Sequence, residues 1–226
     1  MYNVLTLNKI ATCGTDLLDK SKYTVGDDIA NPDAILVRSA SMHEMELPSN
    51  LLAIARAGAG VNNIPIDKCS EQGVVVFNTP GANANAVKEL VIAGLLLSSR
   101  KIPAAMDWIK TLKGKGDEVG KLVEKGKSQF VGPEIMGKKL GVIGLGAIGI
   151  LVANAAAELG MDVYGADPYL SVENALKLSG KVHYVKSNKE IFEKCDYITL
   201  HVPALPDTKG MIIAEAISSM KKTVLL

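Results

Sequence analysis

The sequence predicts an α/β protein of two lobes, each built on a parallel sheet. Short β-rich runs alternate with helical stretches, which is the pattern of parallel strands covered by helices on both faces. Near the middle, residues 113–127 mix charges with glycines and separate one α/β run from the next. At 226 residues the chain is long enough for one large domain or two modest ones, each able to bury a core.

The first lobe is predicted to hold four strands and two helices. Its strands are the β-rich runs at residues 2–7, 34–38, 52–56 and 74–78. Helices are expected at residues 14–20 and 66–72, and Gly73 follows the second of them, where helices commonly end.

A further helix is predicted over residues 83–102. Its apolar residues Ala86, Leu90 and Leu97 fall near helical spacing, and Pro103 follows. We expect this helix to bridge the lobes, which places the first lobe over residues 1–96 and the second over residues 97–226. The charged stretch at 113–127 is expected to be a solvated or partner-covered connector.

The second lobe repeats the alternation of strands and helices. Strands are predicted at residues 139–144, 162–166, 182–185, 196–201 and 223–226. Helices are predicted at residues 148–159, 189–194 and 213–220.

Composition argues against several classes of function. The formal net charge is only +1, so the chain has no excess of positive charge that would attract a nucleic acid or an anionic membrane surface. No apolar run reaches the eighteen or so residues of a membrane span. The three cysteines form no C-x-x-C pair, and His43 and His183 have no carboxylate or cysteine at ligand spacing, so no metal site is expected. The N-terminus lacks the pattern of a secretory signal, and a cytoplasmic protein is the expectation.

A glycine-rich turn carries the strongest functional signal. Gly144, Gly146 and Gly149 follow the strand at residues 139–144 directly, and Ala147 and Ile148 open the helix behind it. Here the first glycine permits the tight turn, the second lets backbone approach a pyrophosphate, and the third lets helix and strand pack closely. N–H groups at the helix N-terminus would face the phosphates. This context predicts a Rossmann dinucleotide site.

An acidic residue stands where the ribose partner belongs. Asp167, followed by Pro168, comes after the second strand of this lobe, at the spacing typical of such sites. Its carboxylate would accept hydrogen bonds from the ribose hydroxyls and repel a 2′-phosphate, so NAD is predicted over NADP. The alternative is an ordinary turn aspartate before a proline.

The first lobe contains a second glycine turn. Gly58 and Gly60 flank it, so the backbone N–H groups of Ala59, Gly60 and Val61 could point at a carboxylate without obstruction. Two arginines sit at the ends of strands in the same lobe and could bring guanidinium groups to a phosphate or carboxylate: Arg38 and Arg56. An isolated arginine is more commonly part of a surface ion pair, and this alternative stays open.

Taken together, these motifs resemble the D-isomer-specific 2-hydroxyacid dehydrogenases over nearly the whole chain. The resemblance rests on residues 37–40, 56–64, 77–80, 83–89, 144–149, 167–169, 201–203 and 207–208. It implies a flavodoxin-like substrate lobe and a Rossmann NAD domain, both incomplete, with the active site in the cleft between them. It also implies that Arg38 and Arg56 contact a phosphorylated substrate, and that family members pair through residues 101–137, which predicts a homodimer.

His201 ends a strand in the predicted nicotinamide site, where a histidine could act as a catalytic acid. The resemblance instead implies that this segment borders the nicotinamide ribose through His201, Val202, Pro203 and Thr208. In the family an arginine, a glutamate and a histidine perform the chemistry, in that order, and all three would follow Leu226. We therefore expect a truncated chain that holds NAD without turnover.

For the full-length protein, the resemblance implies the NAD-dependent oxidation of D-3-phosphoglycerate to 3-phosphohydroxypyruvate in serine biosynthesis. The two arginines favour a phosphorylated hydroxy acid. One alternative is another D-2-hydroxyacid dehydrogenase, such as a glyoxylate or hydroxypyruvate reductase or a D-lactate dehydrogenase. Another is a binding module that senses NAD and has lost catalysis.

Overall fold

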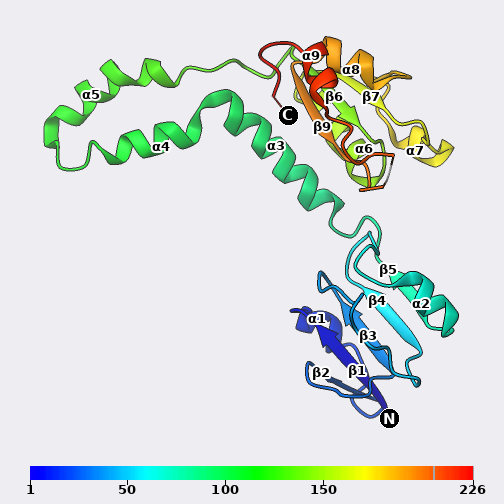
Figure 1. The fold of residues 1–226 in the computed structure, drawn as a ribbon. Helices are drawn as coiled ribbons and strands as arrows, with labels where there is room; N and C mark the ends of the chain where they lie inside the picture. The colour runs from blue at the N-terminus through cyan, green and yellow to red at the C-terminus, as the bar shows by residue number, and fades with distance from the viewer. Residues whose placement is uncertain (206, 226) are drawn as a thin grey trace. The chain divides into compact units, whose positions relative to one another are not determined.

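The computed structural model describes residues 1–205 and 207–225, and the chain forms two compact units, Met1–Asn83 and Ala84–Leu226. Each unit contains one sheet, of five strands in the first and four in the second (Figure 1). Every strand pair in both sheets is parallel. The predicted α/β fold with two parallel sheets is therefore confirmed.

The first sheet has the strand order β2-β1-β3-β4-β5, which is the flavodoxin-like order. Its strands are β1 (Tyr2–Leu7), β2 (Tyr23–Gly26), β3 (Ala34–Val37), β4 (Ala53–Arg56) and β5 (Val75–Asn78). Two short helices accompany it, α1 (Thr12–Thr15) and α2 (Ile66–Glu71).

The core of the first unit lies on one face of this sheet. Ile35 and Val37 alternate along β3 and are fully buried, because successive side chains of a strand point to opposite faces, and Ile54 of β4 is fully buried beside them. Cys69 of α2 and Ile64, which precedes that helix, pack in the same hydrophobic cluster as these strand residues. This packing fixes the ends of β3 and β4, where both arginines of the lobe stand.

The first crossover differs from its prediction. A helix was expected over residues 14–20, but α1 ends at Thr15 and buries no residue. The chain turns at Asp19, whose carboxylate accepts hydrogen bonds from the Ser21 backbone N–H at 2.9 Å and hydroxyl at 2.7 Å. The edge strand β2 follows that turn, and sequence reasoning missed it.

The second sheet has the order β8-β7-β6-β9, which is the order of the first four strands of a Rossmann domain. Its strands are β6 (Lys139–Ile143), β7 (Asp162–Ala166), β8 (His183–Tyr184) and β9 (Tyr197–Leu200). Of the strand predicted at residues 223–226, Leu225 forms a single parallel bridge to Tyr197, and Leu226 lies outside the described residues.

Helices cover both faces of this sheet. On one face α6 (Ala147–Glu158) packs against Leu140 and Val142 of β6. On the other, α8 (Asn188–Lys194) and α9 (Ala214–Ser219) accompany a second cluster that includes Ile143. The strand β6 is buried from Leu140 to Ile143, as expected for the central strand of a doubly wound sheet. Sequence reasoning missed the short helix α7 (Val172–Lys177), which Ser171 caps.

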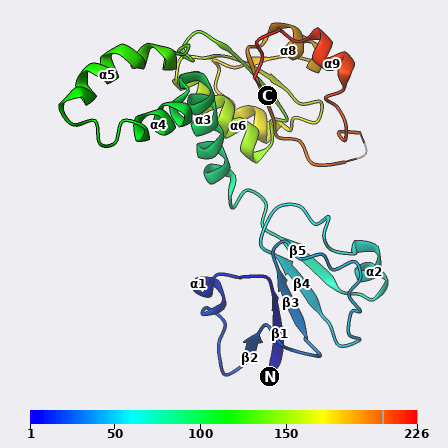
Figure 2. The ribbon, with the colours of Figure 1, turned by 60° about the vertical axis from the view of Figure 1, so that its left-hand side comes forward.

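The long helix α3 (Ala84–Arg100) belongs to the second unit, so the two compact units divide before it. It lies beside α6 (Figure 2) and contributes Val91, Ile92 and Leu95 to the margin of the α6 cluster. Near its end, the buried Ser99 hydroxyl lies 2.7 Å from the Tyr197 hydroxyl of β9. Packing and this hydrogen bond hold the helix to the second sheet.

The segment after α3 is more helical than the predicted connector. It contains α4 (Ile102–Lys110), α5 (Val119–Gly126) and the short 3-10 turns η1 (Gly116–Glu118) and η2 (Lys127–Phe130). The rings of Trp108 and Phe130 lie 5.1 Å apart, so α4 packs against η2. Among the residues described, no helix is long and apolar enough to cross a membrane.

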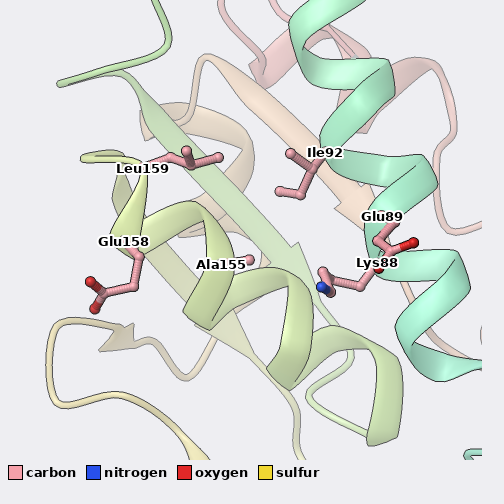
Figure 3. Close-up of a pocket in the computed structure, with 6 residues that line it drawn as sticks. All are labelled: Lys88, Glu89, Ile92, Ala155, Glu158 and Leu159. Atoms are coloured by element: carbon pink, nitrogen blue, oxygen red, sulfur yellow. The ribbon is translucent and has the colours of Figure 1, made fainter.

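A hollow of about 410 Å³ opens where α3 crosses α6. Figure 3 shows Ile92 and Leu159 directed toward the space between the two helices, and Glu158 directed away from it. The lining residues are Lys88, Glu89, Ile92, Ala155, Glu158 and Leu159.

The Ser99–Tyr197 pair gives the attachment of α3 a direct test. Ser99→Ala would leave the Tyr197 hydroxyl buried without this partner and should lower the free energy of unfolding by roughly 1–3 kcal/mol. Tyr197→Phe should cost less, about 1 kcal/mol, because the Ser99 hydroxyl also bonds the Leu95 carbonyl at 2.7 Å. Urea unfolding measures both values, and a larger loss for Tyr197→Phe than for Ser99→Ala would contradict this account.

Candidate functional site

The glycine turn leaves the carboxyl end of β6, between the ends of β7 and β9. Gly144 adopts a φ of +93°, and its N–H donates to the Ala166 carbonyl at the end of β7 at 2.8 Å. A Cβ at this position would lie 2.7 Å from the His201 carbonyl oxygen beyond β9. Both the conformation and the close approach of backbone therefore require glycine here.

Gly149 and Gly146 have different surroundings. A Cβ on Gly149 would lie 1.8 Å from the Gly144 carbonyl oxygen, so the first turn of α6 touches the glycine turn directly. A Cβ on Gly146 would meet no atom within 4 Å, so its side of the turn is open. Ala147 and Ile148 begin the helix, and their N–H groups have no carbonyl acceptor within it. An open glycine beside these N–H groups suits a pyrophosphate.

Asp167 follows β7 and reaches back to the glycine turn. One carboxylate oxygen accepts a hydrogen bond from the Leu145 N–H and the other from the Tyr169 N–H, both at 2.8 Å. The Tyr184 hydroxyl donates to the Asp167 carbonyl at 3.0 Å. Each carboxylate oxygen retains a lone pair for a ribose hydroxyl. Pro168, the next residue, is exposed.

The segment after β9 lines the same edge of the sheet. The His201 N–H donates to the Ile143 carbonyl at 2.8 Å, which places the backbone at 201–202 against Gly144. Its ring Nε2 lies 3.0 Å from the Thr199 hydroxyl, and burial lowers the pKa of the ring below its usual value. The Thr208 hydroxyl donates to the Pro203 carbonyl and accepts from the Leu205 N–H.

The structure thus brings most of the predicted cofactor residues to one edge of the second sheet. The α3–α6 hollow is not part of this edge, because Glu158 and Leu159 lie at the opposite end of α6 from the glycine turn. The hydrogen-bonding groups that suit a dinucleotide lie instead at the turn.

In the first unit the predicted substrate residues also gather at the carboxyl edge of their sheet. Arg56 is the last residue of β4, and it pairs in register with Asn78 of β5 and Val37 of β3. Arg38 comes directly after Val37. The Arg38 side chain is exposed and forms no hydrogen bond or ion pair with the described residues. Arg56 has a different environment: its guanidinium donates from Nε to the Arg38 carbonyl at 3.0 Å and from Nη1 to the Gly60 carbonyl.

The glycine turn of this unit is tied to β5 by two residues that sequence reasoning gave no individual role. The Asn78 side-chain amide donates to the Ala59 carbonyl at 2.6 Å, and the Thr79 hydroxyl accepts from the Gly58 N–H at 2.8 Å. The sequence signal that could have identified them is that both lie in the segment 77–80, which is one of the segments that resemble the family. The N–H groups of residues 59–61 donate to no acceptor within the described parts of the chain.

Comparison with known proteins identifies the family of the chain. Residues 92–226 match the family described as "D-isomer specific 2-hydroxyacid dehydrogenase, NAD binding domain". The chain belongs to this family. Its second unit is thus an NAD-binding domain, and the glycine turn and Asp167 lie within the matched range.

Similar curated proteins include two D-3-phosphoglycerate dehydrogenases. The protein of Methanocaldococcus jannaschii is 36% identical over 91% of this chain and 37% of its own length. That of Bacillus subtilis is 33% identical over 100% of this chain and 43% of its own length. The chain therefore spans less than half the length of these relatives.

Solved structures show the same fold. The NAD⁺-bound 3-phosphoglycerate dehydrogenase of Entamoeba histolytica is 28% identical, with a TM-score of 0.73 over 97% of this chain and 68% of that one. A D-lactate dehydrogenase of Aquifex aeolicus, complexed with NAD and lactic acid, also has a TM-score of 0.73, over 98% of this chain and 67% of that one, at 24% identity.

The two glycines of the NAD turn should respond differently to alanine. Gly146→Ala has room for its methyl group, so we expect an unchanged unfolding temperature and a roughly tenfold weaker affinity for NADH, whose pyrophosphate the methyl would obstruct. Gly149→Ala forces a clash with the Gly144 carbonyl and should cost about 1–3 kcal/mol of stability as well. Calorimetric titration with NADH and thermal unfolding separate the two effects. Unchanged NADH affinity in Gly146→Ala would contradict the proposed position of the pyrophosphate.

Proposed function

We propose that the full-length protein oxidises D-3-phosphoglycerate to 3-phosphohydroxypyruvate with NAD, in serine biosynthesis. The observation that carries this proposal is the pairing of two features at one edge of the first sheet. The turn at residues 59–61 offers N–H groups to a carboxylate, and the exposed Arg38 offers a guanidinium to a second anionic group. A phosphorylated hydroxy acid carries both anions. The names of the similar D-3-phosphoglycerate dehydrogenases support the same substrate.

NAD would accept a hydride from the carbon that bears the substrate hydroxyl. The residues of the second unit would hold the cofactor. The turn and helix α6 would bind the pyrophosphate, Asp167 would bind the adenosine ribose, and residues 201–203 with Thr208 would border the nicotinamide ribose. Asp167 favours NAD because a 2′-phosphate would bring negative charge against its carboxylate.

Arg38 gives the substrate assignment a test. In the full-length protein, Arg38→Ala should lower kcat/KM for D-3-phosphoglycerate at least roughly tenfold, because a charge-assisted contact to the phosphate is lost. Turnover of unphosphorylated D-glycerate should change little, and this comparison is the internal control. A wild-type preference for D-lactate over D-3-phosphoglycerate would reject the proposed substrate.

The protein is further proposed to form a homodimer through residues 101–137. Large apolar side chains are more than half exposed along this segment, which favours burial against a second copy. These side chains are Met106, Ile109, Val131 and Met136.

Light scattering tests this contact. The 226-residue chain should have twice its mass of 23.9 kDa. The double variant Met106→Lys/Ile109→Lys should have the single mass, because dimerisation would bury two added charges from each chain in the interface. Leu176→Lys, at an even more exposed apolar residue of α7, serves as the control and should stay dimeric. A monomeric wild-type chain would refute the proposal.

A further inference from the structure

Arg56 lies inside the glycine turn of the first unit rather than on its outer side. Its guanidinium spans two backbone carbonyls, that of Arg38 after β3 and that of Gly60 in the turn. A Cβ on Gly58 would lie 3.2 Å from the guanidinium carbon, and one on Gly60 would lie 3.2 Å from Nη1. The two glycines therefore let the turn wrap closely around the Arg56 side chain.

The carbonyls of three consecutive residues in this turn each accept a hydrogen bond. The Gly58 carbonyl accepts from the Thr79 N–H at 3.0 Å, the Ala59 carbonyl from the Asn78 amide at 2.6 Å, and the Gly60 carbonyl from Arg56. In a trans peptide, the carbonyl and the following N–H point in opposite directions, and the described chain contains no cis peptide. Each of these hydrogen bonds therefore turns the N–H of the next residue away from the donor that the carbonyl binds.

We propose that Arg56 and Asn78 are positioning residues for the substrate carboxylate, and that Arg38 alone of the two arginines contacts the distal phosphate. Arg56 and Asn78 fix the carbonyls of Gly60 and Ala59, and so aim the N–H groups of Val61 and Gly60 at the carboxylate. This inference rests on the proposed function of the turn as a carboxylate site. It differs from the expectation that both arginines contact the phosphorylated end.

The two roles for Arg56 predict different losses. A positioning residue affects the carboxylate, which phosphorylated and unphosphorylated acids share, whereas a phosphate ligand affects the phosphorylated acid alone. Arg56→Lys keeps the charge but loses the planar fork that spans two carbonyls. Asn78→Ala removes the hydrogen bond to the Ala59 carbonyl without changing any charge.

The experiment measures dissociation constants of D-glycerate and D-3-phosphoglycerate for the full-length protein by calorimetry at saturating NADH. Arg56→Lys and Asn78→Ala should each weaken both acids by the same factor, roughly tenfold. Arg38→Lys is the matched control and should weaken D-3-phosphoglycerate alone. In the ligand-free protein, the amide resonances of Gly60 and Val61 should move in Arg56→Lys and not in Arg38→Lys, and thermal unfolding identifies any variant that has lost its fold.

A loss confined to D-3-phosphoglycerate in Arg56→Lys would overturn the positioning role and leave the proposed reaction intact. Unmoved amide resonances at residues 60–61 would overturn it as well. If the wild-type protein bound neither acid, the turn would not be a carboxylate site, and the proposed function would fall together with this inference.

Discussion

Parallel strand pairing is the constraint on which both candidate sites depend. When strands run in the same direction, their carboxyl ends meet at one edge, and the segments that follow them become neighbours whatever their separation along the chain. In the second unit this brings Gly144 beside Ala166 and His201. In the first unit it brings Arg38, Arg56 and Asn78 together from three adjacent strands. Each unit thus presents its polar groups at an edge that its own core holds rigid.

The two glycine turns use the same residue for different physical reasons. At Gly144 and Gly149 the glycines allow backbone to approach backbone, and the helix N-terminus that results is left free to bind phosphates. At Gly58 and Gly60 they make room for a guanidinium of the protein itself. Similar glycine spacing therefore accompanies a free helix N-terminus in one unit and a turn braced by a side chain in the other.

Local patterns explain which parts of this could be predicted from the sequence. The β-rich runs that form β3 and β4 and the strand–glycine–helix order at Gly144 are local signals, and the structure confirmed them. The edge strand β2 has four half-exposed or exposed residues, and α1 buries no side chain, so neither left a periodic signal.

Contacts between distant residues were beyond prediction. The orientation of Arg56 depends on the carbonyl of Arg38, eighteen residues earlier, and the Ser99–Tyr197 pair joins residues 98 positions apart. A residue type at a strand end predicts which groups reach a site, but not whether a guanidinium faces a ligand or its own backbone.

The assignment of separate binding turns to the two units is tested most directly by mapping amide chemical shifts of the protein during separate titrations with NADH and D-3-phosphoglycerate. We expect NADH to shift the amides of residues 144–149 and Asp167, and the hydroxy acid to shift those of residues 59–61. Shifts by either ligand that centred on the hollow between α3 and α6, with the two turns unmoved, would contradict this assignment.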